Sequence, residues 1–128
     1  MGFLSNLLKG LFGGSTRSTS SYEVDTDQGL RNIEQAVATI FEGYEIKHNV
    51  PVKTFGDYDS VYKFAHVVYD IDGRVKLAVL LVRRNGKKNR NFYNAKQACD
   101  DNGIPFVFFY DYMPNEAAYV DNRIRTSL

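Results

Sequence analysis

The chain has 128 residues, with 16 Lys and Arg against 15 Asp and Glu, 44% hydrophobic residues and one cysteine. This composition is typical of a single globular domain of the cytosolic type, and it leaves no room for two domains of ordinary size. One cysteine excludes an internal disulfide, and with two histidines it supplies too few soft ligands for a structural zinc site. A net charge of +1 gives no overall attraction to nucleic acid or to a membrane. We therefore expect a cytoplasmic protein, peripheral to a membrane only if one segment binds its surface.

Residues 1–12 are expected to form an amphipathic segment, with Ser5, Asn6 and Lys9 opposite an apolar side. The segment is shorter than the roughly 20 apolar residues that cross a bilayer. Residues 13–21 are nearly all Gly, Ser and Thr, which predicts a flexible linker. The segment either forms a frayed helix that docks on its own domain or stays loosely ordered, or it binds a protein partner or a membrane surface. A protein partner is favoured over a membrane because one lysine attracts anionic lipids weakly. The apolar residues, at helical spacing, are Phe3, Leu4, Leu7, Leu8, Leu11 and Phe12.

Residues 22–128 predict one α/β domain. A helix begins near Asp25 to Asp27, which offer N-caps, continues with apolar residues at helical spacing and ends at Gly43. Two β-branched runs, 63–69 and 75–82, are joined through an Asp-Gly hairpin, and the second run is apolar on both faces, as in a central strand. The element order is α-β-β-β-α-β-α, which predicts a mixed sheet with helices on both faces. The remaining elements are a strand over 44–52, a helix over 91–102 with Cys99 on its buried side, a strand over 104–110, and a last helix with Pro114 in its first turn.

Three segments carry a resemblance to a known superfamily. Residues 66–73 read His-Val-Val-Tyr-Asp-Ile-Asp-Gly, residues 77–83 read Leu-Ala-Val-Leu-Leu-Val-Arg, and residues 102–106 read Asn-Gly-Ile-Pro-Phe. In order and spacing they resemble the PD-(D/E)XK nucleases of the restriction-endonuclease-like superfamily, close to the very-short-patch-repair and topoisomerase-associated types. That frame covers roughly half of the predicted domain. The resemblance implies a restriction-endonuclease-like fold over 22–128.

The resemblance also places three residues at catalytic positions. His66 stands where the family has a metal-binding Asp, Leu81 where it has Glu, and Arg83 where it has Lys. Hydrolysis of this kind needs magnesium held by oxygen ligands, whereas Leu81 offers no ligand and imidazole prefers softer metals. Arg83 cannot act as a base because it keeps its proton. The resemblance therefore implies a pseudo-nuclease, a catalytically inactive binding or scaffolding module with no metal and no small-molecule cofactor.

Two alternatives stay open: a protein-interaction module that docks through the helix of residues 1–12, and an active magnesium-dependent nuclease with relocated ligands. The candidate catalytic residues of the nuclease are Glu34, His66 and Asp70, with Glu45 as a further carboxylate. Against this reading, Asp70 precedes a turn that favours Asp for its backbone geometry. His66, between apolar residues of a strand, is predicted to lie in the core or to line a cleft.

The main concentration of charge lies between residues 83 and 96, which contain six basic residues and no acidic one. Cations neutralise phosphates, and the nearby amides and aromatic rings can bind bases, so this basic loop predicts contact with a nucleic-acid backbone. Two other readings stay open: a solvated turn that keeps the protein soluble, or a site for an acidic or phosphorylated protein partner. The basic residues are Arg83, Arg84, Lys87, Lys88, Arg90 and Lys96.

Overall fold

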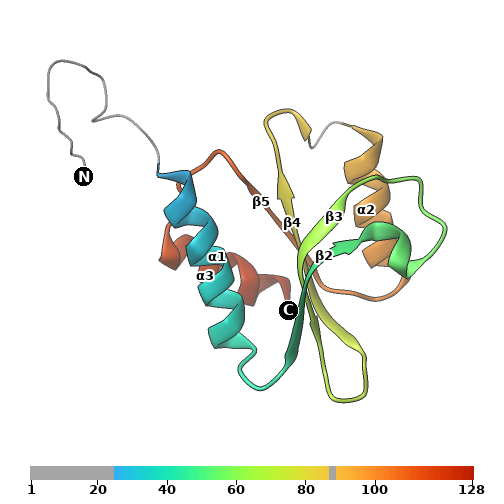
Figure 1. Cartoon of the computed structure of the whole chain (residues 1–128), viewed down its shortest axis with the longest axis horizontal. Helices are drawn as coiled ribbons and strands as arrows, with labels where there is room; N and C mark the ends of the chain where they lie inside the picture. The colour runs from blue at the N-terminus through green and yellow to red at the C-terminus, as the bar shows by residue number, and fades with distance from the viewer. Residues whose placement is uncertain (1–24, 87–88) are drawn as a thin grey trace, which may run out of the picture.

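The computed structural model describes residues 25–86 and 89–128. The predicted amphipathic segment (1–12) and linker (13–21), together with Lys87 and Lys88, lie outside the described residues. The described elements follow the predicted order α-β-β-β-α-β-α (Figure 1). They are α1 (Thr26–Ile40), β2 (Glu45–Pro51), the short 3-10 helix η2 (Val52–Phe55), β3 (Lys63–Tyr69), β4 (Val75–Val82), α2 (Arg90–Asp101), β5 (Phe106–Tyr110) and α3 (Ala117–Ser127).

The strands form a four-stranded mixed sheet in the order β2-β3-β4-β5. Strand β3 pairs antiparallel with both β2 and β4, whereas β5 runs parallel to β4 after the α2 crossover. Strand β4 is internal and buried on both sides, because its apolar run packs against helices on the two faces. The predicted α/β class and mixed sheet are confirmed.

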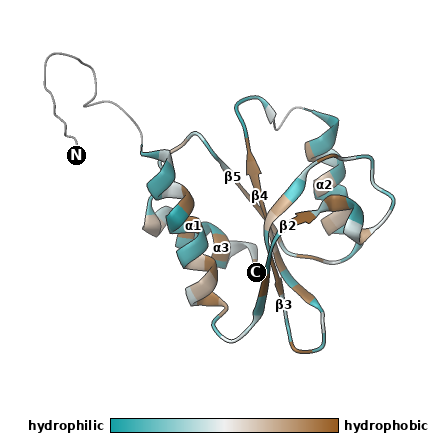
Figure 2. Cartoon of the chain, viewed as in Figure 1, coloured by the Kyte–Doolittle hydropathy of each residue, from teal (hydrophilic) through white to brown (hydrophobic). Residues whose placement is uncertain are grey.

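Two hydrophobic cores cover the two faces of the sheet. On one face α2 packs Phe92, Ala95 and Cys99 against residues such as Phe64 and Leu80. On the other face α1 and α3 pack against the sheet and against each other, through residues that include Ile33, Val37, Val79, Val120 and Ile124. Figure 2 shows hydrophobic residues concentrated on the central strands and hydrophilic residues on the outer surfaces of the helices. The predicted burial of Cys99 is confirmed.

Local signals account for most element ends. The Asp25 carboxylate accepts a hydrogen bond from the Gln28 backbone N–H at 2.9 Å and so caps α1, as predicted. At the hairpin the Gly73 N–H donates to the Asp70 carbonyl at 3.0 Å, and Gly73 has a φ of 81°, a backbone conformation that favours glycine. The hairpin at residues 70–73 is therefore confirmed.

The start of the last helix differs from the prediction. Helix α3 begins at Ala117, so Pro114 lies in the turn before it. The reason is Asn115, which is buried and has a φ of 46°, a left-handed conformation that interrupts a helix. Its side-chain amide donates hydrogen bonds to the Tyr110 carbonyl at 2.9 Å and to the Met113 carbonyl at 3.2 Å. These bonds fix a tight turn between β5 and α3 and delay the helix.

Candidate functional site

The sheet divides where β3 begins and β4 ends. Backbone pairing between β3 and β4 extends from Tyr69–Val75 to His66–Val79. The first part of β3 pairs with β2, through Phe64 and Lys63, whereas the last part of β4 pairs with β5. In Figure 1 the end of β4 follows β5 while β3 follows β2 toward α2. We call this divergence the sheet fork.

Two hollows adjoin at the sheet fork and share Leu81. The histidine hollow, of about 300 Å³, lies between α1 and the sheet and is lined by residues that include Glu34, His48 and His66. The fork hollow, of about 340 Å³, lies between the diverging strands and is lined by residues that include Lys63 and Arg83. His66 thus lines a hollow, as predicted, and Leu81 and Arg83 lie at the same end of the sheet.

The histidine hollow contains a cross-strand pair of imidazoles. His48 and His66 are direct partners in the β2–β3 register, and their Nδ1 atoms lie 2.9 Å apart. At that separation one Nδ1 donates a proton and the other accepts it, so the contact is lost if both nitrogens are protonated. Burial, and then the charge of His48, lower the pKa of His66, while Glu34 opposes this shift. When both rings are neutral, the ring that accepts carries its own proton on Nε2, so the pair keeps one further N–H donor while it stays hydrogen-bonded.

The basic loop does not form a uniform cationic surface. Arg90 forms an ion pair with Asp59 at 2.7 Å, and Lys96 forms one with Asp100 at 3.1 Å. The Arg84 guanidinium lies over the Tyr112 ring, 4.2 Å from its centroid. Arg83 is exposed and makes no side-chain hydrogen bond or ion pair with another residue of the described ranges 25–86 and 89–128. Among the described basic-loop residues, Arg83 is thus the best placed to bind an external anion.

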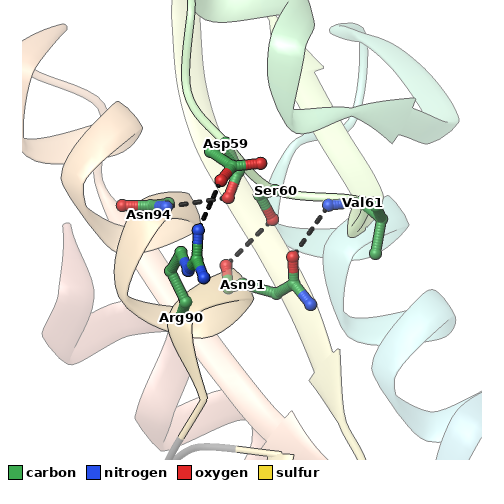
Figure 3. A network of polar contacts seen from close by, with 6 residues as sticks. All are labelled: Asp59, Ser60, Val61, Arg90, Asn91 and Asn94. Carbon is green, nitrogen blue, oxygen red and sulfur yellow. Dashed lines mark hydrogen bonds and ion pairs between the residues drawn. The ribbon is translucent and has the colours of Figure 1, made fainter.

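The segment before β3 is fastened to the start of α2 (Figure 3). The Asn94 side chain donates to the Asp59 carbonyl at 2.7 Å, and the Ser60 hydroxyl donates to the Asn91 carbonyl at 2.9 Å. The Val61 backbone N–H in turn donates to Asn91 Oδ1 at 3.0 Å. These bonds join the polar segment to the first turn of α2 through the Asn91 carbonyl and the side chains of Asn91 and Asn94. They hold the beginning of β3, with Lys63, on the α2 side of the sheet fork.

Tyr62, which precedes β3, connects that side of the sheet fork to the basic loop after β4. The Tyr62 hydroxyl donates to the Gly86 carbonyl at 3.4 Å and accepts from Asn89 Nδ2 at 2.7 Å. Asn89 in turn caps α2, because its Oδ1 accepts from the Phe92 N–H at 3.0 Å. The two sides of the sheet fork are therefore connected by side chains rather than by a strand ladder.

The residues at the sheet fork do not fit magnesium. Leu81 has no donor atom, His66 offers a nitrogen ligand, and Arg83 is a cation. Of the proposed relocated ligands, Glu34 and His66 line the same hollow, but Asp70 does not. Asp70 lies four residues along β3 from His66, about 13 Å away at the usual rise of a strand. Across residues 25–86 and 89–128 no three His, Cys, Asp or Glu side chains are grouped so that they could hold a metal ion.

Asp70 has a structural role at the hairpin. Its Oδ1 accepts hydrogen bonds from the backbone N–H groups of Arg74 at 2.9 Å and Asp72 at 2.8 Å. Both bonds lower the pKa of the Asp70 carboxyl, and the bond from the Arg74 N–H has the larger effect. Asp72 also belongs to the hairpin, because its backbone N–H is held by the same carboxylate. This arrangement agrees with the reading of Asp70 as a turn residue.

Three residues of the site were not identified from the sequence. Arg31 and His48 line the histidine hollow, and Lys63 lines the fork hollow. The alternation over residues 44–52 puts His48 on one side of a strand, but its meeting with His66 depends on the register between two strands. Arg31 and Glu34 are three residues apart in a predicted helix and so lie on one face of it. This spacing is the local signal from which Arg31 could have been identified.

Comparisons with models of protein families, with curated proteins and with solved structures find no match for this chain. In the described part of the chain, every helix is too short or too polar to cross a membrane.

Proposed function

We propose that the chain binds the phosphate backbone of a nucleic acid at the sheet fork and does not cleave it. The proposal rests on a restriction-endonuclease-like fold in which the catalytic positions have been replaced. One observation carries it: His66, Leu81 and Arg83, the residues at the three replaced positions, all line the two adjoining hollows, and Leu81 lines both. Residues spread over 18 positions of the sequence thus share one opening in the sheet.

The charges around the opening favour an anion. Arg31, Lys63 and Arg83 are exposed side chains on α1, on β3 and after β4. Among the residues that line the two hollows, Glu34, in the histidine hollow, is the acidic one. A guanidinium can bind a phosphate through two parallel hydrogen bonds, and each neutralised phosphate releases counterions. The remaining N–H of the neutral histidine pair adds an uncharged donor. The opening therefore suits a phosphodiester held by cations and hydrogen bonds.

The same residues supply no cleavage chemistry. Magnesium would activate a water molecule and stabilise the developing charge, but the side chains at the matching positions are an alkyl group, an imidazole and a guanidinium. Arg83 can hold a phosphate in place of the family's lysine, yet it cannot take up a proton. Binding without turnover is the chemistry that this set of groups supports.

The experiment is a titration of fluorescently labelled single- and double-stranded DNA and RNA, followed by anisotropy at 50 and 200 mM salt. The test variant is Lys63→Ala/Arg83→Ala, and the control is Arg74→Ala/Lys76→Ala, which removes the same charge at the hairpin end of the sheet. Each lost phosphate contact lowers the slope of log K against log salt by about one unit. We expect a fall of about two units for the test variant and none for the control.

Two results would contradict the proposal. Equal effects of the test and control variants would mean that binding follows overall charge, and absence of binding at 50 mM salt would remove nucleic acid as the partner. Incubation with Mg²⁺ or Mn²⁺ tests the cleavage alternative, which Glu34 and His66 favour because they line one hollow. Cleavage that is lost in Glu34→Ala and in His66→Ala would establish a nuclease with relocated ligands.

A further inference from the structure

A third hollow, which is mainly apolar, lies between the end of β5 and the start of α3. It has a volume of about 370 Å³ and is lined by residues that include Tyr110, Met113, Pro114 and Tyr119. Met113 is 45% exposed and Tyr119 is 51% exposed, although both are large hydrophobic side chains. Adjacent exposed apolar side chains around a concave surface are typical of an interaction site. The hollow is separate from the sheet fork and has no part in the proposed function.

The hollow lies beside the first turns of α1, where the described domain begins. Gly29 is buried against the turn that forms the hollow, so close that a Cβ atom on it would lie 2.5 Å from the Pro114 carbonyl oxygen. The Asn32 side chain donates to the Asn115 carbonyl at 3.1 Å. In Figure 1 the connection from β5 to α3 passes next to the beginning of α1. Whatever precedes Thr26 in the chain is therefore attached close to the hollow.

The preceding sequence contains a segment of matching chemistry. Residues 1–12 have six apolar side chains at helical spacing, and Lys9 is their only charged side chain, whereas Glu116 contributes an acidic group to the lining of the hollow. Thirteen residues, 13 to 25, separate this segment from α1. A Gly/Ser-rich chain of that length has a root-mean-square span of about 20 Å and can extend to about 45 Å. A tether of this kind gives an effective concentration in the millimolar range, so even a weak contact forms within the chain.

We propose that the apolar side of residues 1–12 docks, within the same chain, into the hollow lined by Tyr110, Met113 and Tyr119. Docking removes apolar surface of both partners from water, which is the driving force for the contact. Lys9 carries a charge opposite to that of Glu116 in the lining of the hollow.

The test uses the two methionines of the full chain, Met1 and Met113, labelled with ¹³C in their methyl groups and observed by NMR. Met113 reports directly on the hollow. The test variant Leu7→Asp/Leu8→Asp places two charges on the apolar side of residues 1–12, and the control Ser5→Asp/Asn6→Asp places two charges on the opposite side. We expect the Met113 signal of the test variant to move to its position in a chain that starts at residue 22, and that of the control to stay at the wild-type position. An identical Met113 signal in all four proteins would overturn the proposal.

A spin label identifies what occupies the hollow. The label is attached to Asn6→Cys, because burial raises the pKa of the Cys99 thiol to about 12 and leaves it unreactive in the folded protein. Docking within the chain predicts broadening of the Met113 signal that does not change on dilution. A sample that mixes spin-labelled chains with separate ¹³C-labelled chains tests for a second copy. Broadening in that mixture would assign the hollow to another molecule and refute docking within the chain. Cosedimentation with anionic phospholipid vesicles, together with an unbroadened Met113 signal, would refute it in favour of a membrane.

Discussion

Replacement of Gly29 by alanine tests the packing of α1 against the turn before α3. In the interior of a helix this change normally stabilises a protein by about 0.5–1 kcal/mol, because alanine loses less backbone entropy. At Gly29 the new Cβ would lie 2.5 Å from the Pro114 carbonyl oxygen, 3.0 Å from its carbon and 3.1 Å from Asn115 Cβ. Two of these atoms belong to the backbone and cannot rotate away. Overpacking of this kind costs about 1–3 kcal/mol, so we expect a net loss of about 1–2 kcal/mol.

The assay is equilibrium unfolding in urea, with Thr39→Ala as the control. Thr39 is exposed in the same helix, so its replacement should change the free energy of unfolding by less than about 0.5 kcal/mol. In a thermal scan the Gly29→Ala loss corresponds to a decrease in Tm of about 4–8 °C per kcal/mol for a domain of about 100 residues. A Gly29→Ala protein as stable as the wild type, or more stable, would refute the close approach of α1 to the turn at Pro114.

Two further predictions concern the sheet fork. Because burial lowers the pKa of His66 from its ordinary value of 6.5, the unfolded chain binds the proton more readily than the folded one, and stability is lost as the pH falls below that value. We expect His66→Gln to reduce the fall in the free energy of unfolding between pH 7 and pH 5; an unchanged pH profile in urea titrations would argue against a buried neutral His66. Tyr62→Phe removes the hydroxyl that contacts Gly86 and Asn89. It should cost about 1 kcal/mol and speed hydrogen exchange of the Gly86 and Asn89 amides, and exchange at the wild-type rate would contradict this fastening.

The fold could be predicted where the signals were local. Ile33 and Val37 repeat at helical spacing and face the core, and the apolar run that ends at Val82 became an internal strand. The start of α3 could not be predicted in this way. It depends on Asn115, whose side chain is buried and bonded to the Tyr110 carbonyl, and that environment exists only after β5 and α1 have packed together.

The sequence pointed to some of the residues at the sheet fork, namely His66, Leu81 and Arg83, but not to their neighbours. The sequence shows a cluster of cations between residues 83 and 96. It does not show that Arg90 and Lys96 are paired with acids, whereas Arg83 is paired with no acidic side chain of residues 25–86 and 89–128. It also could not bring His48 beside His66, because a shift of one residue between two strands would separate them. The number of charged residues in a segment is evident from the sequence. The partner of each charge depends on contacts between segments that are distant in the sequence.

The sheet fork follows from a competition between backbone and side-chain partners. The Val52 N–H donates to the Tyr62 carbonyl and the Val61 N–H donates to Asn91, so the start of β3 is fixed on the side of β2 and α2. On the other side, the Asp111 N–H donates to the Val82 carbonyl and extends the pairing of β4 with β5. The backbone groups on each side of the sheet fork thus already have hydrogen-bond partners. Pairing the start of β3 with the end of β4 would break these bonds before new ones formed. The opening is therefore set by bonds present before any ligand binds, and a phosphate held there need not reorganise the sheet.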